Sequence, residues 1–314
     1  MPTPADWSEK LQAFLNTWKQ NPRSDEYLGD GPFIQFVLTE QAASWDDFLI
    51  WLRELEGSWC FRGQREAAWL LNTSLDLAVK REYSSENSSG SYHLDRETEG
   101  RELLFRFQQQ AHSYIAHPPP SEDLSSWFAL MQHHGVPTRL LDWTSSPYVA
   151  LFFALEEQTQ EKDGSSALWA VDMDWLERKG RELLPPQPPA ATLDGSETSA
   201  EYINGLLRET EQPVIVKINP RRANERMFAQ QGVFLCKLFH PATFGLILMS
   251  MMIHPQPPAR PVVRKLELGT NLRIEFLKNL RAMNVHRASL FPGIDGFGRS
   301  LKLDLEIKVK SGED

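Results

Sequence analysis

The chain has 314 residues, of which 41% are hydrophobic and 24% charged, and this composition excludes disorder as a description of the whole. Its net charge of −9 argues against a protein that coats nucleic acid. Only Cys60 and Cys236 are present, which excludes a disulfide framework and a cysteine-built metal site.

The charge is unevenly spread along the chain. Residues 213–312 hold 16 basic and 6 acidic side chains, whereas the preceding residues are acidic. This basic C-terminal third can offer a positive face to an anionic ligand or to a macromolecular partner, a protein or a nucleic acid. The alternative is that it packs against the acidic remainder.

No segment predicts a membrane protein or a secreted one. The longest apolar run, Phe244 to Ile253, is far shorter than the roughly 18–20 residues that cross a bilayer. The chain opens without a basic segment followed by an apolar one, so we expect a cytoplasmic location and no membrane partner.

In chain order, helical spacing of apolar residues predicts a helix within residues 1–20, and we expect residues 1–44 to form an N-terminal helical extension. A domain over residues 45–312 follows. Two polar stretches, near 82–93 and 185–200, are expected to be surface insertions. The predicted helices are 45–55, 95–116, 121–131, 148–155, 221–231 and 273–283. The predicted strands are 33–38, 59–63, 167–171, 214–218 and 232–236, with a short strand before Thr144.

Two segments are less regular in pattern. Residues 244–253 are continuously apolar and are predicted as a strand or a buried segment. Residues 288–299 are predicted as a loop that leads to a last helix or strand. The mixture of elements, without an internal repeat, predicts an α+β fold.

The centre of the chain carries the clearest local signals. Ser146 and Pro147 are an N-cap followed by proline at the first helical position. The segment from Tyr148 to Leu155 is apolar all round, which predicts a buried helix.

Generic catalytic and metal motifs are absent from the sequence. It contains no P-loop, no dinucleotide-type glycine motif, no nucleophile elbow and no His-Glu-x-x-His. His133 and His134 are neighbours and cannot both face one metal on regular structure, so no metal is expected. A serine hydrolase built on Ser145 or Ser146 would need distant partners.

Four blocks of sequence together resemble the FRG domain, a family named for its Phe-Arg-Gly motif. The resemblance covers roughly residues 45–300. The blocks are Trp59-Cys-Phe-Arg-Gly-Gln64 with Trp69, the run from Met131 to Ala154, Asn224-x-Arg226-x-x-x-Gln230-x-Gly232-x-Phe234, and Ser289-Leu-Phe-Pro-Gly-Ile-Asp295.

The residue types in these blocks suit an anionic ligand that carries a sugar. Arg62, at the end of a strand and beside Gly63, is a bidentate donor for phosphate or carboxylate where the backbone permits close approach. The hydroxyls of Thr144, Ser145 and Ser146 lie where a strand passes into a helix, a place that also offers backbone N–H groups to an anion.

The order of the blocks is similar to that of the Arg-Ser-Glu type of mono-ADP-ribosyltransferase. That resemblance implies a split β core flanked by helices, with NAD as the substrate. It also implies that Arg62 holds the phosphates or the nicotinamide ribose and that Ser145 orders the pocket strand. The expected catalytic residues are Arg62, Ser145, Gln230 and Asp142. The expected NAD-binding residues are Arg62, Gly63, Gln64, His133, His134, Thr138, Arg139, Thr144 and Ser145.

The third element of the pattern departs from the family. Where the transferases carry a glutamate, this chain has Gln230-Gln231-Gly232, with Glu225 nearby. A glutamine cannot supply a negative charge. Electrostatic stabilisation of developing charge is commonly the largest contribution to catalysis. Transfer is therefore weaker, another acid such as Asp142 replaces the glutamate, or no transfer occurs.

Structural roles remain open for each residue. Arg62 could pair with Asp142, Arg139 could neutralise the same carboxylate, and Gln132 and the histidines could fix the turn. Trp59, Trp69 and Trp143 could belong to the core, and Phe291 to Asp295 could form a packing corner.

The sequence thus predicts a transferase that passes ADP-ribose from NAD to a macromolecule, or an NAD glycohydrolase. Family analogy suggests a toxin or an anti-phage effector. The alternatives are a binding module for a nucleotide, a nucleic acid or a protein, without turnover, and a nuclease that uses His133 or His134.

Overall fold

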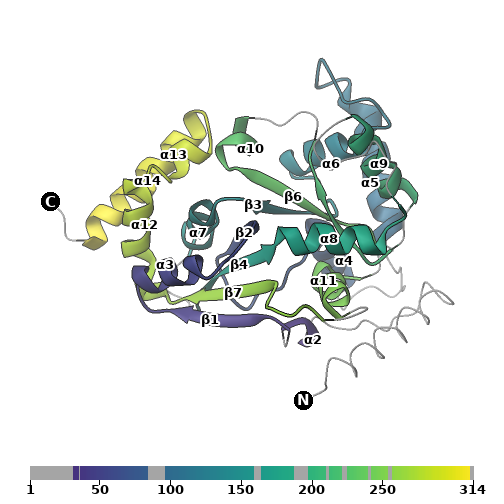
Figure 1. Cartoon of the computed structure of the whole chain (residues 1–314). Coiled ribbons are helices and arrows are strands. Elements are labelled where there is room, and N and C mark those ends of the chain that lie inside the picture. Colours follow the sequence, from purple (N-terminus) through teal and green to yellow (C-terminus); the bar gives the residue numbers. More distant parts are fainter. Residues whose placement is uncertain are drawn as a thin grey trace.

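A computed structural model gives the fold of the chain (Figure 1). It describes residues 31–34, 36–83, 96–158, 164–186, 197–209, 212–220, 225–239, 242–253 and 257–311. The helix expected within residues 1–20 lies outside these ranges, as do most of the two expected polar insertions.

Within the described residues, one mixed sheet of seven strands, in the order β1-β7-β4-β2-β3-β6-β5, forms the centre of the molecule. β1 runs parallel to β7, and all other neighbours are antiparallel. The strands are β1 (Leu38–Ala42), β2 (Trp59–Gln64), β3 (Leu140–Thr144), β4 (Ser166–Asp172), β5 (Ile215–Ile218), β6 (Gly232–Lys237) and β7 (Val263–Leu268).

The sheet is nearly divided between β2 and β3. These strands are registered at a single position, Phe61 opposite Thr144, whereas β2 pairs with β4 along its whole length. β3 likewise pairs with β6 from end to end. One half of the sheet is therefore β1-β7-β4-β2 and the other is β3-β6-β5, which agrees with the expectation of a split β core.

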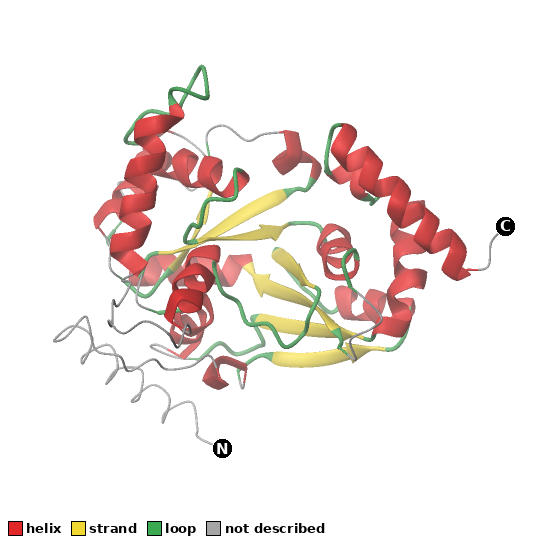
Figure 2. Ribbon diagram, turned by 180° about the vertical axis from the view of Figure 1, so that it is seen from behind, coloured by secondary structure: helices red, strands yellow, loops and turns green. Residues whose placement is uncertain are grey.

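Helices lie on both faces of this sheet (Figures 1 and 2). One core, around Trp169 and Phe244, contains side chains of α6, α8, α9 and α11, and the other, around Phe152 and Phe276, contains side chains of α3, α7 and α12. The mixed α+β fold class is thus confirmed. The helices are α2 (Gly31–Ile34), α3 (Trp45–Arg53), α4 (Ser74–Tyr83), α5 (Arg96–Ala111), α6 (Leu124–His133), α7 (Pro147–Leu155), α8 (Met173–Leu183), α9 (Glu197–Glu209), α10 (Glu225–Ala229), α11 (Phe244–Ile253), α12 (Arg273–Ala282), α13 (Arg287–Leu290) and α14 (Ile294–Ser311), with a 3₁₀ turn η1 (Thr270–Leu272).

Helix α7 forms as its sequence predicts. The Ser146 hydroxyl accepts a hydrogen bond from the Val149 N–H at 3.3 Å, and Pro147 occupies the first turn. Most of its side chains are fully buried, because the helix packs directly on β2.

Gly63 makes that packing possible. A Cβ atom at this position would lie 1.9 Å from the Ala150 carbonyl oxygen and 2.6 Å from the Ala154 nitrogen. The glycine of the Phe-Arg-Gly motif therefore lets a helix backbone approach the strand. The sequence predicts that the strand stops at Gly63, whereas β2 continues one residue further, to Gln64. That Gly63 also lets a ligand approach stays a prediction.

Two segments differ from the strands that their apolar residues allowed: residues 33–38, predicted as a strand, and residues 244–253, predicted as a strand or a buried segment. The strand predicted over 33–38 is wrong, because Phe33 ends up in helix α2 and the strand begins at Leu38. Phe33 and Val37 are four residues apart and both buried in the same core, a spacing that lies on one face of a helix and of a strand alike, so the pattern of apolar residues does not distinguish the two. Residues 244–253 form helix α11 with every residue buried, so the apolar run carries no periodicity that would identify it.

Several elements were not predicted at all. Helices α4, α8 and α9 and strand β7 form from segments that gave no clear signal. The loop expected over 288–299 is instead α13 followed by the start of α14. Within the described ranges, no helix combines the length and apolar content that crossing a membrane requires.

The close approach at Gly63 leads to a stability prediction. Gly63→Ala should cost more than about 3 kcal/mol of unfolding free energy, because the clashing atoms belong to the backbone of α7 and cannot move aside. Gly205→Ala in α9 is the control, since its added Cβ meets nothing within 4 Å and should stabilise the helix slightly. Urea unfolding of both variants measures the difference. Equal stability of Gly63→Ala and the parent protein would contradict this account of the motif.

Candidate functional site

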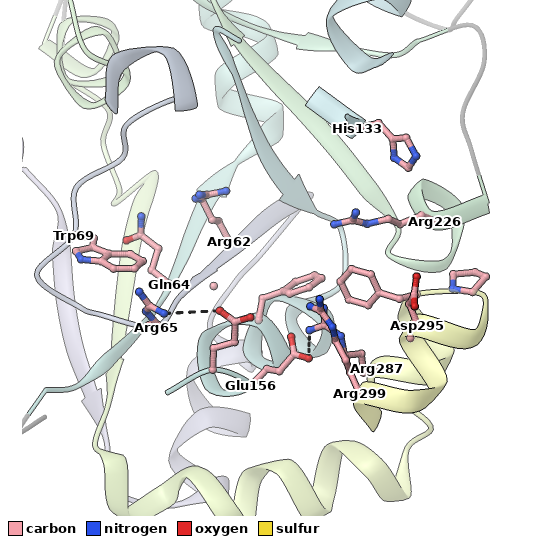
Figure 3. A pocket seen from close by; sticks show the side chains of 16 residues that line it. Arg62, Gln64, Arg65, Trp69, His133, Glu156, Arg226, Arg287, Asp295 and Arg299 are labelled. Atoms are coloured by element: carbon pink, nitrogen blue, oxygen red, sulfur yellow. Dashed lines mark hydrogen bonds and ion pairs between the residues drawn. The ribbon is translucent and has the colours of Figure 1, made fainter. Parts of the chain in front are cut away.

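A cleft of about 720 Å³ opens beside the divided part of the sheet (Figure 3). It is built from β2, the end of α6, the C-terminal part of α7, and α10, α13 and α14. All four sequence blocks therefore contribute to one site, although they are far apart in the chain. The lining residues are Arg62, Gly63, Gln64, Arg65, Trp69, His133, Phe153, Glu156, Glu157, Arg226, Arg287, Phe291, Pro292, Asp295, Gly296 and Arg299.

Arg62 extends across the gap between β2 and β3. Its Nη1 donates a hydrogen bond of 2.6 Å to the carbonyl oxygen of Asp142 on β3. Its Nε is buried without a hydrogen-bond partner among the described residues. Burial lowers the pKa of the guanidinium, and the charge of Asp142 offsets part of this effect. The side chain joins the two halves of the sheet and keeps donor capacity for a ligand.

Phe291 lies between two guanidinium groups. Arg226 lies 4.5 Å from the ring centroid and Arg287 lies 4.4 Å from it. Phe153 of α7 packs edge-on against the same ring, with centroids 5.9 Å apart. These contacts fix α10, α13 and α7 around one side of the cleft.

The five arginines of the cleft are not all neutralised. Arg287 pairs with Glu156, and Arg65 lies 3.8 Å from Glu157. For the other three, no carboxylate of a described residue lies within ion-pair distance. These three are Arg62, Arg226 and Arg299. The cleft therefore has an excess of positive charge that an anionic ligand would balance.

Asp142 lies on β3 at the sheet division, where its carbonyl accepts the hydrogen bond from Arg62. Its carboxylate is exposed and accepts a hydrogen bond of 2.9 Å from the side-chain amide of Gln132. The charge of this carboxylate acts on both Arg62 and Arg226 and raises their pKa values, although burial lowers both overall. Asp142 itself lies just outside the set of lining residues.

Four of the residues predicted from the sequence line the cleft. They are Arg62, Gly63, Gln64 and His133. The Gln64 side chain is held in place, because its Oε1 accepts from the Trp169 indole at 2.7 Å and its Nε2 donates to the Leu70 carbonyl. Its first role is therefore to fix the strand next to Arg62.

Thr144, Ser145 and Gln230 lie at the junction of β3 and β6, outside the cleft lining. The Thr144 hydroxyl donates to the Gln230 carbonyl at 2.7 Å, and the Ser145 N–H donates to the Gln231 carbonyl at 3.0 Å. The Gln230 side chain donates to the Leu290 carbonyl on α13. These residues join β3, β6 and α13 and so set the shape of the cleft wall.

Thr138 and Arg139 face away from the cleft. Both line a second cavity, of about 390 Å³, between α5, α6 and α9. Arg139 donates to the Leu207 carbonyl at 2.6 Å and lies over the Phe128 ring, and it does not pair with Asp142. The turn between α6 and these residues contains Gly135, at φ +76°, and Pro137. His134 caps α6 and packs against His133.

His133 is the histidine that reaches the cleft. Partial burial lowers the pKa of its ring below the usual value, and the positive charges of His134 and Arg226 lower it further. These effects favour the neutral form of the ring in the free protein. Among the residues that the structure describes, no three His, Cys, Asp or Glu side chains gather in a way that could hold a metal ion.

Sequence reasoning missed most of the charged lining. Arg226 and Phe291 belong to the motif blocks. The sequence nevertheless predicts only a packing role for Phe291 and no role for Arg226. Glu156 and Arg287 gave no separate signal, because their pairing joins segments more than a hundred residues apart. Trp69 follows the Phe-Arg-Gly strand and is 44% exposed, so at least one of the three tryptophans is not core.

Comparison with known protein families confirms the resemblance stated above. Residues 57–163 match the family described as FRG domain. This span holds β2, the turn after α6, β3 and α7, and the later blocks lie beyond it. Searches of curated proteins and of solved structures find no match.

The cleft should bind a multivalent anion such as pyrophosphate. Arg62→Gln should weaken binding roughly ten- to hundredfold, because hydrogen bonds to charged groups contribute about 1.5–3 kcal/mol. Arg53→Gln is the control, since this arginine is exposed on α3 and outside the cleft. Isothermal titration calorimetry measures both. Unchanged affinity in Arg62→Gln would place the anion elsewhere.

Proposed function

Because residues 57–163 are an FRG domain, with Arg62 of the family's motif in an anion-suited cleft, we propose that the protein binds NAD there and cleaves its bond to nicotinamide. The ADP-ribose passes to a macromolecular acceptor or to water. The observation that carries the proposal is the convergence of Arg62, Arg226 and Arg299, unpaired among the described residues, on a cavity large enough for a small ligand.

The diphosphate of NAD is the group that these arginines suit. A guanidinium presents paired donors to phosphate oxygens, and a cleft with an excess of positive charge also attracts the anion over a distance. Arg62 lies at the division of the sheet, Arg226 lies on α10 and Arg299 lies on α14. The phosphates would therefore be held between strand β2 on one side and these two helices on the other.

The cleft also offers aromatic surface for a base. Trp69 lines it, is 44% exposed, and carries the Arg65 guanidinium 4.9 Å from its ring centroid. An exposed indole is a suitable stacking partner for adenine or nicotinamide.

The reaction requires a negatively charged group that stabilises the positive charge developing on the ribose, and an acceptor for the proton of the attacking oxygen. The bond between C1′ of the ribose and the ring nitrogen breaks, and its electron pair passes to nicotinamide, which leaves as a neutral molecule. The acceptor oxygen then bonds to C1′, and its proton passes to solvent water. A carboxylate would stabilise the positive charge that develops on the ribose. We assign this role to Asp142, because its exposed carboxylate lies at the sheet division and its charge acts on both Arg62 and Arg226.

A binding module without turnover is the second candidate. The position of the transferase glutamate is held here by Gln230, whose side chain is engaged by the Leu290 carbonyl. The same cleft would then recognise a nucleotide diphosphate and use it as a signal.

Turnover of NAD separates the two candidates. The parent protein should release nicotinamide from NAD, and Arg62→Gln should lower kcat/KM roughly ten- to hundredfold through lost phosphate contacts. Asp142→Asn should lower kcat and leave KM near its parent value, because it removes charge needed only in the transition state. Asp46→Asn, on the exposed side of α3, is the control. Nicotinamide is followed by chromatography.

The outcomes differ for each candidate. Binding of NAD without release of nicotinamide, in the presence and absence of cell lysate as a source of acceptors, would support the binding module. Absence of both binding and release would contradict the proposal in either form.

His133 should make binding depend on pH. A bound diphosphate offsets the positive charges that lower the pKa of this ring, so the pKa rises on binding. Affinity for ADP-ribose should therefore increase as the pH falls through the range around 6.5, where the bound form takes up a proton first. The diphosphate diester does not titrate there. His133→Gln should flatten this dependence, and the exposed His117→Gln should preserve it. Equal pH dependence in the two variants would exclude His133 from the cleft's ligand contacts.

A further inference from the structure

The outer face of helix α14 carries a row of exposed apolar side chains. Their exposed fractions range from 51% to 78%. They repeat at intervals of three or four residues, which places them on one side of the helix. The residues are Ile294, Phe297, Leu301, Leu305 and Val309, and we call this row the outer stripe.

The opposite side of the same helix already packs on the molecule. Gly296, Ser300 and Ile307 are buried, and Leu303 packs against the core around Phe276. Arg281 pairs with Asp304 and Arg273 with Glu306, which fixes the orientation of the helix. α14 is therefore apolar on two sides, and only one of them is covered. A contiguous apolar surface of this kind marks a site of association.

We propose that the outer stripe pairs with the outer stripe of a second copy of this chain, in an antiparallel arrangement about a two-fold axis near Leu301. The protein is then a homodimer with α14 at its centre. This inference is independent of the proposed reaction.

The spacing of the stripe is self-complementary about Leu301. Phe297 lies four residues before it and Leu305 four residues after it, while Ile294 and Val309 lie seven before and eight after. An antiparallel copy thus sets Phe297 against Leu305 and Ile294 against Val309. Gly298 lies within the stripe with open space around its Cβ position, so the opposing Leu305 can approach closely.

Charge also favours the antiparallel direction. The first turn of α14 carries Asp295, and its last turn carries Lys308 and Lys310. Antiparallel pairing brings the first turn of one copy near the last turn of the other and aligns the two helix dipoles favourably. The contribution of these side chains is small, because Asp295 lines the cleft and Lys310 already pairs with Glu306. Parallel pairing would set like charges together, at a cost.

The contact area fits a dimer of modest strength. Five large side chains that are each more than half exposed present on the order of 500 Å² per copy, which gives about 1,000 Å² in total, near the lower limit for a specific interface. The dimer should therefore dissociate at low protein concentration.

The proposed interface lies next to the cleft. Asp295, Gly296 and Arg299 of α14 line the cleft, while the stripe faces the other way. In the dimer, the C-terminal turn of the second copy's α14 comes close to the N-terminal turn that borders the cleft.

Analytical ultracentrifugation of the full chain tests the proposal. The parent protein should sediment as a species of twice 36.0 kDa at high micromolar concentration and dissociate on dilution. Leu301→Glu should be a monomer, because the two copies would bury like charges at the axis. Ile50→Glu is the matched control, since Ile50 is 52% exposed on α3 and Leu301 is 53% exposed. A monomeric parent, including one that binds vesicles or another protein through the stripe, would overturn the proposal, as would a dimeric Leu301→Glu.

Disulfide crosslinking tests the direction of pairing in the folded protein. Leu301→Cys should form a disulfide with its own copy on mild oxidation, because it lies at the axis. Val309→Cys alone should not, but should crosslink when mixed with Ile294→Cys. The native thiols of Cys60 and Cys236 are buried and do not interfere. Efficient crosslinking of Val309→Cys to itself would overturn the antiparallel arrangement.

Discussion

The contact of helix α7 with strand β2 at Gly63 is the constraint on which the rest of the structure depends. The backbone of α7 occupies the space that any side chain at residue 63 would need. Because side chains alternate along a strand, Phe61 and Gly63 face α7, and Arg62 points to the other side, toward β3. The Phe-Arg-Gly motif therefore combines three roles in consecutive residues: Phe61 belongs to the core, Arg62 is the cation at the cleft, and Gly63 permits the contact with α7.

The same constraint explains why the cleft lies where it does. β2 and β3 share one registered pair, and Arg62 bridges the gap beyond it by donating to the Asp142 carbonyl. The C-terminal part of α7 then brings Phe153 and Glu156 to the edge of this gap, where Phe291 and Arg287 meet them. The cations of the cleft are thus supported by packing and ion pairs on one side, while the side toward the gap retains positive charge for a ligand.

The sequence predicted the parts of the fold whose signals are local. The Ser146 cap, Pro147 and a short apolar run predicted helix α7, and apolar residues before a glycine predicted β2. Helix α11 could not be told from a strand, because a segment buried on every side has no polar positions to show its period. Phe33 was assigned to a strand for a similar reason, since the five apolar residues among 33–38 fit both elements.

The candidate site was predictable only in part. Arg62 and His133 could be assigned to the site because each stands in a motif that is continuous in sequence. Arg139 belongs to the same motif, but the turn after α6 directs it into the second cavity, and no pattern of residue types encodes that direction. Arg287 and Arg299 lie in the cleft because of contacts between distant segments, such as the pairing of Arg287 with Glu156. Such contacts follow from the three-dimensional fold and leave no mark in local spacing.

The crystal structure of the protein with ADP-ribose bound would test the central claim most directly. The account predicts the diphosphate within hydrogen-bond distance of the Arg62 guanidinium, with Arg226 or Arg299 on its other side and Asp142 near C1′ of the terminal ribose. A diphosphate bound away from Arg62, or an ADP-ribose molecule seated in the second cavity beside Arg139, would contradict it.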